Sequence, residues 1–141
     1  MYRKNRKIYL LDPFIYNAIS AKVYGFMHKP FTYSKEQILT PTKKPALVEN
    51  TTALSLAEKY SKLYFGQSPK HEIDFVSFHE GKYEYFEVKY QKEVKEEEFS
   101  WTKDLVGKAP FFVLTQKTFG ENRISFIPAE VFLSSQFFQT Q

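Results

Sequence analysis

The sequence contains no cysteine, which excludes several classes of site. A disulfide framework, a cysteine-ligated zinc or iron–sulfur centre and a thiol nucleophile are all ruled out. Long hydrophobic runs are missing as well: none approaches the ~20 residues of a membrane span, and the apolar stretch from Ile8 to Leu11 ends at Asp12-Pro13. The basic start is therefore not expected to be a signal peptide, and we expect a cytoplasmic protein with no membrane segment.

Charge is distributed unevenly along the 141 residues. Residues 1–45 hold nine Lys or Arg against two acidic residues, whereas residues 46–141 hold eleven against fourteen. We therefore expect a basic N-terminal segment, 1–45, and a separate folded domain, 46–141. The basic cluster at the start could neutralise phosphates of a polyanion, or it could be a solvated tail; its members are Arg3, Lys4, Arg6 and Lys7.

Hydrophobic periodicity and turn residues predict an α/β protein. The N-terminal part is expected to contain a short strand, a helix and a linker, over residues 8–11, 13–23 and 29–45. The remainder is expected to run helix, hairpin, helix, strand, strand, helix, over residues 45–63, 71–91, 93–105, 111–114, 123–127 and from 128 onward.

The hairpin carries the strongest chemical signal. A turn centred on Glu80-Gly81 pairs Asp74 with Glu87, and by the same register Glu72 with Lys89. Because side chains alternate along a strand, these four residues would share one face of the hairpin. The opposite face would be the core face, formed by Ile73, Phe75, Phe86 and Val88.

Two carboxylates directly opposite each other on a sheet are destabilising unless something compensates their charge. A divalent cation does so, since Mg²⁺ binds one or two protein carboxylates and completes its shell with water and phosphate oxygens. Lys89, two residues beyond Glu87, would orient a metal-bound water or stabilise negative charge in a transition state. The pattern therefore favours phosphodiester hydrolysis with Mg²⁺ or Mn²⁺. Glu72 is either a fourth acidic residue of the site or the salt-bridge partner of Lys89, and we favour the salt bridge.

Asp74 followed by Glu87-Val88-Lys89 resembles the signature of the PD-(D/E)XK nuclease superfamily, with Ile73 in place of its proline. More narrowly, four blocks in order resemble the C-terminal part of archaeal and bacterial AAA-type ATPases, where a winged-helix segment precedes a nuclease-like domain; these blocks are residues 7–13, 47–50, 72–76 and 86–90. The chain has no Gly-x-x-x-x-Gly-Lys-Ser/Thr motif, so it is not itself expected to be the ATPase.

The resemblance implies a restriction-endonuclease-like fold, a mixed β-sheet flanked by helices with an α-β-β-β-α-β core. It also implies a metal held by Asp74 and Glu87, with the Val88 carbonyl as a third ligand. Glu49 would be an accessory ligand or a group that positions the attacking water. Lys89 would be the catalytic lysine. Gln91 would follow on the same face and contact the phosphate, and residues 1–45 would be a winged-helix remnant.

Two functions of different classes follow from these features. The first is an endonuclease that cuts nucleic acid, most simply DNA, and acts as a homodimer because double-strand cleavage usually needs two sites. It would be the C-terminal part of an AAA-type ATPase or a stand-alone relative of one, with an ATPase domain in the same chain or in a partner chain. The second is a catalytically inactive nuclease-like module that binds DNA or docks such an ATPase. Metal binding would discriminate between the two.

Overall fold

The structure is a computed structural model that describes residues 7–10 and 12–138. The chain forms two compact units that divide between Leu54 and Ser55. This division falls inside helix α3 (Lys44–Lys59), whereas the boundary expected from charge lies at residue 45.

The first unit contains α1 (Pro13–Val23), α2 (Pro30–Leu39) and the N-terminal part of α3. Helix α1 begins where the sequence predicts, because Asp12 accepts a hydrogen bond from the amide of Phe14 at 2.7 Å and a proline follows the cap. The described residues of this unit include no β-strand, so they hold no counterpart of the wing of a winged helix.

Helix α2 replaces the predicted linker. Proline in the first turn of a helix costs no hydrogen bond, and Pro30 occupies that place in α2. Ser34 then turns its hydroxyl back to the carbonyl of Pro30 at 2.9 Å. The ring of Tyr33 stacks on Phe26 with centroids 5.3 Å apart, which fixes α2 against the turn after α1. The prolines and hydroxyl residues that suggested a loop therefore start and pack a helix.

The strand predicted over residues 8–11 is also absent from the described residues. Residues 7–10 adopt no regular secondary structure, and Leu11 lies outside the described residues. Leu10 is held by the side chain of Asn50 on α3, whose Oδ1 accepts from the Leu10 amide at 2.9 Å and whose Nδ2 donates to the Leu10 carbonyl at 3.0 Å. A side-chain amide thus takes the place of a partner strand.

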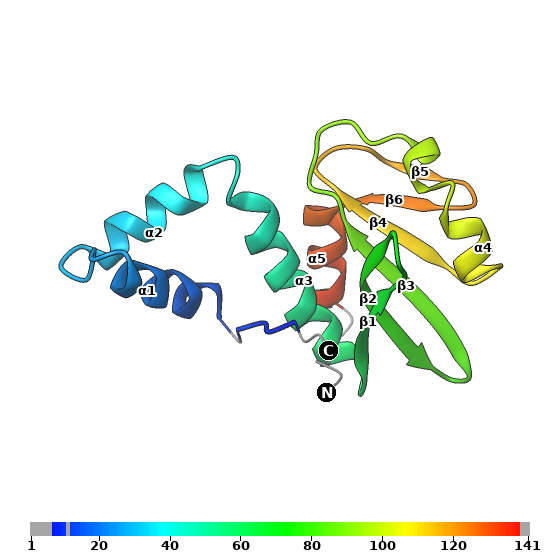
Figure 1. Cartoon of the computed structure of the whole chain (residues 1–141), viewed down its shortest axis with the longest axis horizontal. Helices are drawn as coiled ribbons and strands as arrows, with labels where there is room; N and C mark the ends of the chain where they lie inside the picture. The colour runs from blue at the N-terminus through cyan, green and yellow to red at the C-terminus, as the bar shows by residue number, and fades with distance from the viewer. Residues whose placement is uncertain (1–6, 11, 139–141) are drawn as a thin grey trace. The chain divides into compact units, whose positions relative to one another are not determined.

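The second unit is built on a mixed six-stranded sheet in the order β1-β2-β3-β4-β6-β5 (Figure 1). Strands β1, β2 and β3 pair antiparallel, β3 pairs parallel with β4, and β4 pairs parallel with β6. The chain is therefore an α/β protein, as predicted. The elements of this sheet are β1 (Leu63–Gln67), β2 (Glu72–His79), β3 (Lys82–Val88), β4 (Phe111–Thr115), β5 (Gly120–Glu121) and β6 (Ser125–Pro128).

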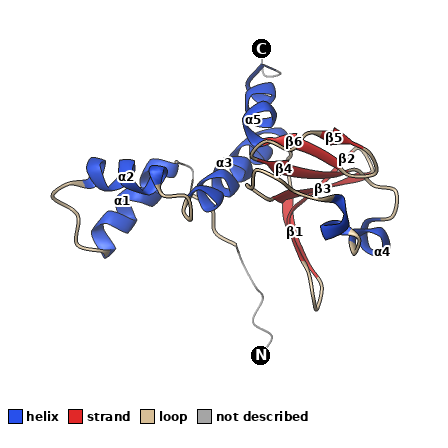
Figure 2. Cartoon of the chain, turned by 90° about the horizontal axis from the view of Figure 1, so that it is seen from above, coloured by secondary structure: helices blue, strands red, loops and turns tan. Residues whose placement is uncertain are grey.

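Helices of this unit lie on opposite faces of the sheet (Figure 2). We call one the α5 face, because Phe86 stacks on Phe112 and contacts Phe132 of α5 (Ala129–Phe138). The other is the α4 face, covered by a 3-10 helix (Glu96–Phe99) and by α4 (Thr102–Val106). Its core contains Phe99, Val106, Phe111, Val113 and Phe126, with Val76, Tyr85 and Trp101 packed against them.

The predicted elements of this unit are mostly present. The hairpin, the β4 strand and the final helix occur where predicted, while the helix expected over residues 93–105 is shortened to the 3-10 turn and α4. Strand β1 was not predicted, since residues 64–70 were assigned to no element; the helix predicted over residues 45–63 ends at Lys59.

Candidate functional site

The β2–β3 hairpin has the predicted register. Phe75 pairs with Phe86, and the pairing continues without a shift to His79 and Lys82. The turn between them consists of Glu80 and Gly81, whose φ values of 50° and 78° are those of the two-residue turn that matches strand twist. The turn residues therefore fix which acidic residues meet at the far end of the hairpin.

A bulge interrupts β2 at the candidate site. Strand β1 pairs Tyr64 with Val76 and then Gly66 with Ile73, so Asp74 and Phe75 together oppose the single residue Phe65. An extra residue reverses the alternation of side chains beyond it. Asp74 therefore lies at the irregularity itself, where a strand commonly changes the direction of a functional side chain.

The bulge corrects part of the predicted face assignment. Ile73 belongs to the core of the α4 face, whereas Phe75 pairs with Phe86, whose ring packs on the α5 face. The two residues were predicted to share a face. Glu72 lies beyond the bulge, so the predicted alternation does not hold for it either; it pairs with Gln67 of β1. Sequence reasoning missed this because β1, the strand that creates the bulge, was not predicted.

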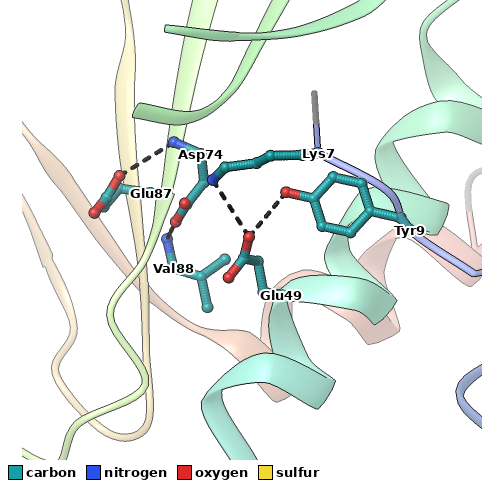
Figure 3. A network of polar contacts seen from close by, with 6 residues as sticks. All are labelled: Lys7, Tyr9, Glu49, Asp74, Glu87 and Val88. Atoms are coloured by element: carbon teal, nitrogen blue, oxygen red, sulfur yellow. Dashed lines mark hydrogen bonds and ion pairs between the residues drawn. The ribbon is translucent and has the colours of Figure 1, made fainter. Parts of the chain in front are cut away.

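Asp74 and Glu87 are brought together by two hydrogen bonds that cross the hairpin in opposite directions (Figure 3). The amide of Asp74 donates to Glu87 Oε2 at 3.3 Å, and the amide of Val88 donates to Asp74 Oδ2 at 2.9 Å. These bonds lie directly beyond the pair formed by Phe75 and Phe86, at the end of the hairpin away from its turn. Each carboxylate is half-buried and oriented by the backbone of the opposite strand.

The neighbouring strand β4 sets the direction of Glu87. In the parallel pairing of β3 with β4, Glu87 lies beside Val113, a fully buried residue of the α4-face core. Paired residues of adjacent strands project to the same side of a sheet. Glu87 therefore leaves the backbone on the α4 face, and its carboxylate turns toward the amide of Asp74.

Lys89 follows β3 directly and is anchored through its backbone. Its amide donates to the carbonyl of Leu114 at 2.8 Å, and its carbonyl accepts from the amide of Gln91 at 2.6 Å. The second bond closes a three-residue turn, which ends the strand alternation at Lys89. Strand alternation therefore does not place Gln91 on the face of Glu87, contrary to the prediction. Gln91 is exposed, and its carbonyl accepts a hydrogen bond from the amide of Gln116.

Glu49 belongs to the first unit, on α3, and is described there by itself. Its Oε1 accepts a hydrogen bond from the Tyr9 hydroxyl at 2.8 Å and forms an ion pair with Lys7 at 3.4 Å (Figure 3). Both partners come from the N-terminal segment that Asn50 also holds. Of the basic cluster predicted to bind nucleic acid, Lys7 is therefore paired with a carboxylate; Arg3, Lys4 and Arg6 lie outside the described residues.

The carboxylate oxygens of Asp74 and Glu87 are suitable ligands for a hard divalent cation. Mg²⁺ prefers carboxylate and carbonyl oxygens, and it uses one or two protein carboxylates together with substrate phosphates. Ligating carboxylates are themselves commonly held by hydrogen bonds, as these two are. Within the described ranges there is no group of three or more His, Cys, Asp or Glu suited to a metal. The pair could thus hold Mg²⁺ together with a phosphate, but no described cluster forms a closed structural metal site.

A second polar pair on the hairpin was not foreseen. The hydroxyl of Tyr60, just after α3, donates to Glu84 Oε2 on β3, and Tyr60 is only 4% exposed. Burial, followed by the hydrogen bond and the charge of Glu84, raises the pKa of Tyr60 well above its ordinary value. The available signal was the register, which places Glu84 opposite the buried Ser77 and so on the inner side of the hairpin.

Comparison with known proteins gives no relative: no family model, curated protein or solved structure matches this chain. Among the described residues, no helix combines the length and apolar character needed to span a bilayer.

Proposed function

We propose that the second unit is a divalent-metal-dependent nuclease domain that hydrolyses phosphodiester bonds, most simply in DNA. The observation that carries this proposal is the reciprocal bonding of Asp74 and Glu87 beside the bulge in β2. Two facing carboxylates destabilise a sheet unless their charge is offset, and a bound divalent cation would offset it.

The topology around the pair supports the proposal. Helix α3 is followed by the antiparallel strands β1, β2 and β3, then by α4 and the parallel strand β4. This is the α-β-β-β-α-β order of the restriction-endonuclease-like core to which the Asp74 and Glu87-Val88-Lys89 pattern was compared. Fold alone does not determine activity, so the proposal rests on the side chains.

The residues of the second unit would divide the chemistry between them. Asp74 and Glu87 would hold Mg²⁺ or Mn²⁺, which supplies Lewis-acid activation of water and of the scissile phosphate. Val88, whose amide already orients Asp74, lies between Glu87 and Lys89 and offers its carbonyl as a third oxygen. Lys89, which is half-buried, would stabilise the negative charge that develops on the phosphate.

Plasmid nicking tests this assignment directly. The full chain is incubated with supercoiled DNA and millimolar Mg²⁺ or Mn²⁺, beside Asp74→Ala and Lys89→Ala variants. We expect nicking by the wild type and at least a 100-fold loss in both variants, since removal of one electrostatic contact to a transition state costs roughly 10²–10³ in rate. Lys108→Ala is the matched control, because Lys108 is an exposed lysine after α4 that does not line the groove on this face of the sheet. Nicking by Asp74→Ala at the wild-type rate would refute the assignment.

A second function, a nuclease-like module without activity, is favoured by one observation in the first unit. Glu49, the acid expected to assist the metal, already forms an ion pair with Lys7 and accepts a hydrogen bond from the Tyr9 hydroxyl. Such a module would bind DNA or an ATPase through a scaffold that has lost its chemistry. Calorimetry with millimolar Mn²⁺ separates the two: binding that Glu87→Ala abolishes supports the enzyme, and absence of binding to the wild type supports the module.

A further inference from the structure

An open groove lies on the α4 face of the hairpin sheet, with a volume of about 460 Å³. Tyr64 of β1, Phe78 of β2 and the β3 residues Tyr83 and Tyr85 line it, and Leu105 of α4 closes one side. Three of these rings are about half exposed: Tyr64 at 53%, Phe78 at 45% and Tyr83 at 50%. The aromatic residues of this sheet therefore do not all fill the core, as aromatic content alone would suggest.

The rings form a continuous series. Phe78 and Tyr83 lie with centroids 4.7 Å apart, Tyr83 and Tyr85 are 6.3 Å apart, and Tyr85 stacks on the buried Phe111 at 6.4 Å. One end of the series is thus anchored in the core and the other is open to solvent. Rings supported in this way offer rigid flat faces that lose little conformational entropy when a ligand covers them.

The groove reaches the candidate site along two strands. Ile73, one of its lining residues, directly precedes Asp74, and the bulge is what brings Ile73 onto this face. On β3, Tyr85 stands two residues before Glu87, which leaves the backbone on the same side. A chain molecule whose backbone lies at Asp74 and Glu87 would therefore place its neighbouring units over the rings.

The lining chemistry selects the kind of unit. Among the residues that the structure describes, no charged side chain lines the groove, and the polar groups there are tyrosine hydroxyls, the amide of Gln67 and backbone. Flat heteroaromatic rings with polar edges match such a surface, because each offers a π face for stacking and hydrogen-bonding groups at its rim. Exposed lysines adjoin the groove strands in sequence, Lys62 before Leu63 and Lys82 before Tyr83, where they can meet phosphates.

We propose that this groove binds the unpaired bases of a single-stranded nucleic acid by stacking on Tyr64 and Tyr83. The proposal rests on the proposed phosphodiester chemistry and specifies its substrate as a single-stranded segment. Bases inside a duplex are already stacked on each other and present no face to these rings. Single strands are therefore bound in preference to duplexes of equal length.

Fluorescence anisotropy of a labelled octathymidylate in EDTA tests the groove, because EDTA prevents cleavage and leaves only binding. Tyr64→Ala and Tyr83→Ala are each expected to weaken binding about 5- to 150-fold, the range seen when one base-stacking ring is removed. Tyr83→Phe keeps the ring and is expected to bind like the wild type. Phe119→Ala is the matched control: Phe119 is 68% exposed in the same unit and does not line the groove.

An abasic oligomer of the same length isolates the contribution of the bases. It is expected to bind the wild type and Tyr83→Ala equally. Three results overturn the proposal: equal affinity of octathymidylate for wild type and both alanine variants, a loss that the abasic oligomer reproduces, or tighter binding of the duplex. Sedimentation of the same variants adds a fourth, since a wild-type dimer that Tyr83→Ala dissociates, with oligonucleotide affinity unchanged, would mean that a second copy covers the groove.

Failure of the groove and failure of the nuclease assignment are distinguishable. Asp74→Asn is expected to keep oligonucleotide binding in EDTA while losing cleavage in Mg²⁺. If cleavage depends on Asp74 but oligonucleotide affinity is unchanged in Tyr83→Ala, only the groove proposal is refuted. Binding that depends on Tyr83 with no cleavage of single-stranded or duplex DNA refutes the nuclease alone.

Discussion

The amide of Val88 donates a hydrogen bond to Asp74 Oδ2 at 2.9 Å, so the carboxylate that is the candidate metal ligand also joins two strands. A substitution at Asp74 therefore affects both chemistry and stability. The two effects can be separated because asparagine keeps an oxygen that accepts the amide but loses the charge.

Asp74→Asn is expected to abolish Mn²⁺ binding with little loss of stability, whereas Asp74→Ala is expected to abolish binding and cost about 1 kcal/mol or more, since it leaves the Val88 amide without this acceptor. Calorimetry with Mn²⁺ and urea unfolding measure the two effects. Glu80→Gln, which removes a well-exposed charge from the same hairpin, serves as the control. Equal stability of the two Asp74 variants would show that the bond to Val88 contributes nothing.

Local patterns predicted the hairpin and its acidic pair, because both depend on neighbouring residues. Glu80 and Gly81 define a two-residue turn, and that turn determines the register that brings Asp74 to Glu87. The α/β class followed in the same way from local signals, such as the continuous apolar run of β4 and the proline directly before α5.

The features that were missed depend on residues distant in sequence. The bulge at Asp74 exists only because β1 pairs with β2, and residues 64–67 of β1 carry no local pattern that predicts a strand. Likewise, the bonds of Glu49 to Lys7 and Tyr9 join residues about 40 positions apart, which no spacing rule connects. Periodicity therefore identified the acidic residues but could not give their partners or the direction of Asp74.

The Tyr60–Glu84 pair predicts a loss of stability in alkali. The pKa of Tyr60 in the folded protein is raised above its ordinary value of 10.0, chiefly by burial, so the folded state holds the phenol proton more tightly than the unfolded chain. The corresponding stabilisation is complete below pH 10 and is lost as the pH rises through the folded pKa.

Urea unfolding of the wild type and Tyr60→Phe at several pH values measures this dependence. At pH 7 we expect Tyr60→Phe to be less stable by about 1–3 kcal/mol, because the half-buried Glu84 carboxylate loses its donor. The difference is expected to shrink above pH 10. Tyr83→Phe, at an exposed tyrosine of the same strand, controls for general tyrosine titration. A difference that stays constant from pH 7 to 11 would contradict the assignment.

Asn50 predicts how the N-terminal segment is held. Asn50→Ala removes both bonds to Leu10, and because Asn50 is 9% exposed we expect a cost of about 1–2 kcal/mol. Asn50→Asp keeps the acceptor for the Leu10 amide and loses only the donor. Hydrogen exchange of the Leu10 amide is therefore expected to accelerate strongly in Asn50→Ala and less in Asn50→Asp. Unchanged exchange in Asn50→Ala would mean that other contacts hold the segment.

Substitutions in the turn that sets the hairpin register are expected to lower or to raise stability, depending on the position. Gly81 has a φ of 78°, which an L-residue with a side chain adopts only at a cost, so Gly81→Ala is expected to destabilise the second unit by about 1 kcal/mol. Glu80 already adopts a φ of 50° with a side chain, and asparagine tolerates that region better. Glu80→Asn is therefore expected to stabilise by a few tenths of a kcal/mol to about 1 kcal/mol.

Gly120→Ala provides the control for these turn variants, because a Cβ at Gly120 would meet Phe126 at an ordinary 3.9 Å and Gly120 has no positive φ. The urea midpoint should be highest for Glu80→Asn, intermediate for Gly120→Ala and lowest for Gly81→Ala. Since Glu80→Asn leaves the register unchanged, it should also leave Mn²⁺ binding at Asp74 and Glu87 unchanged. A stabilised variant that loses the metal would show that the turn and the acidic pair are not linked through register alone.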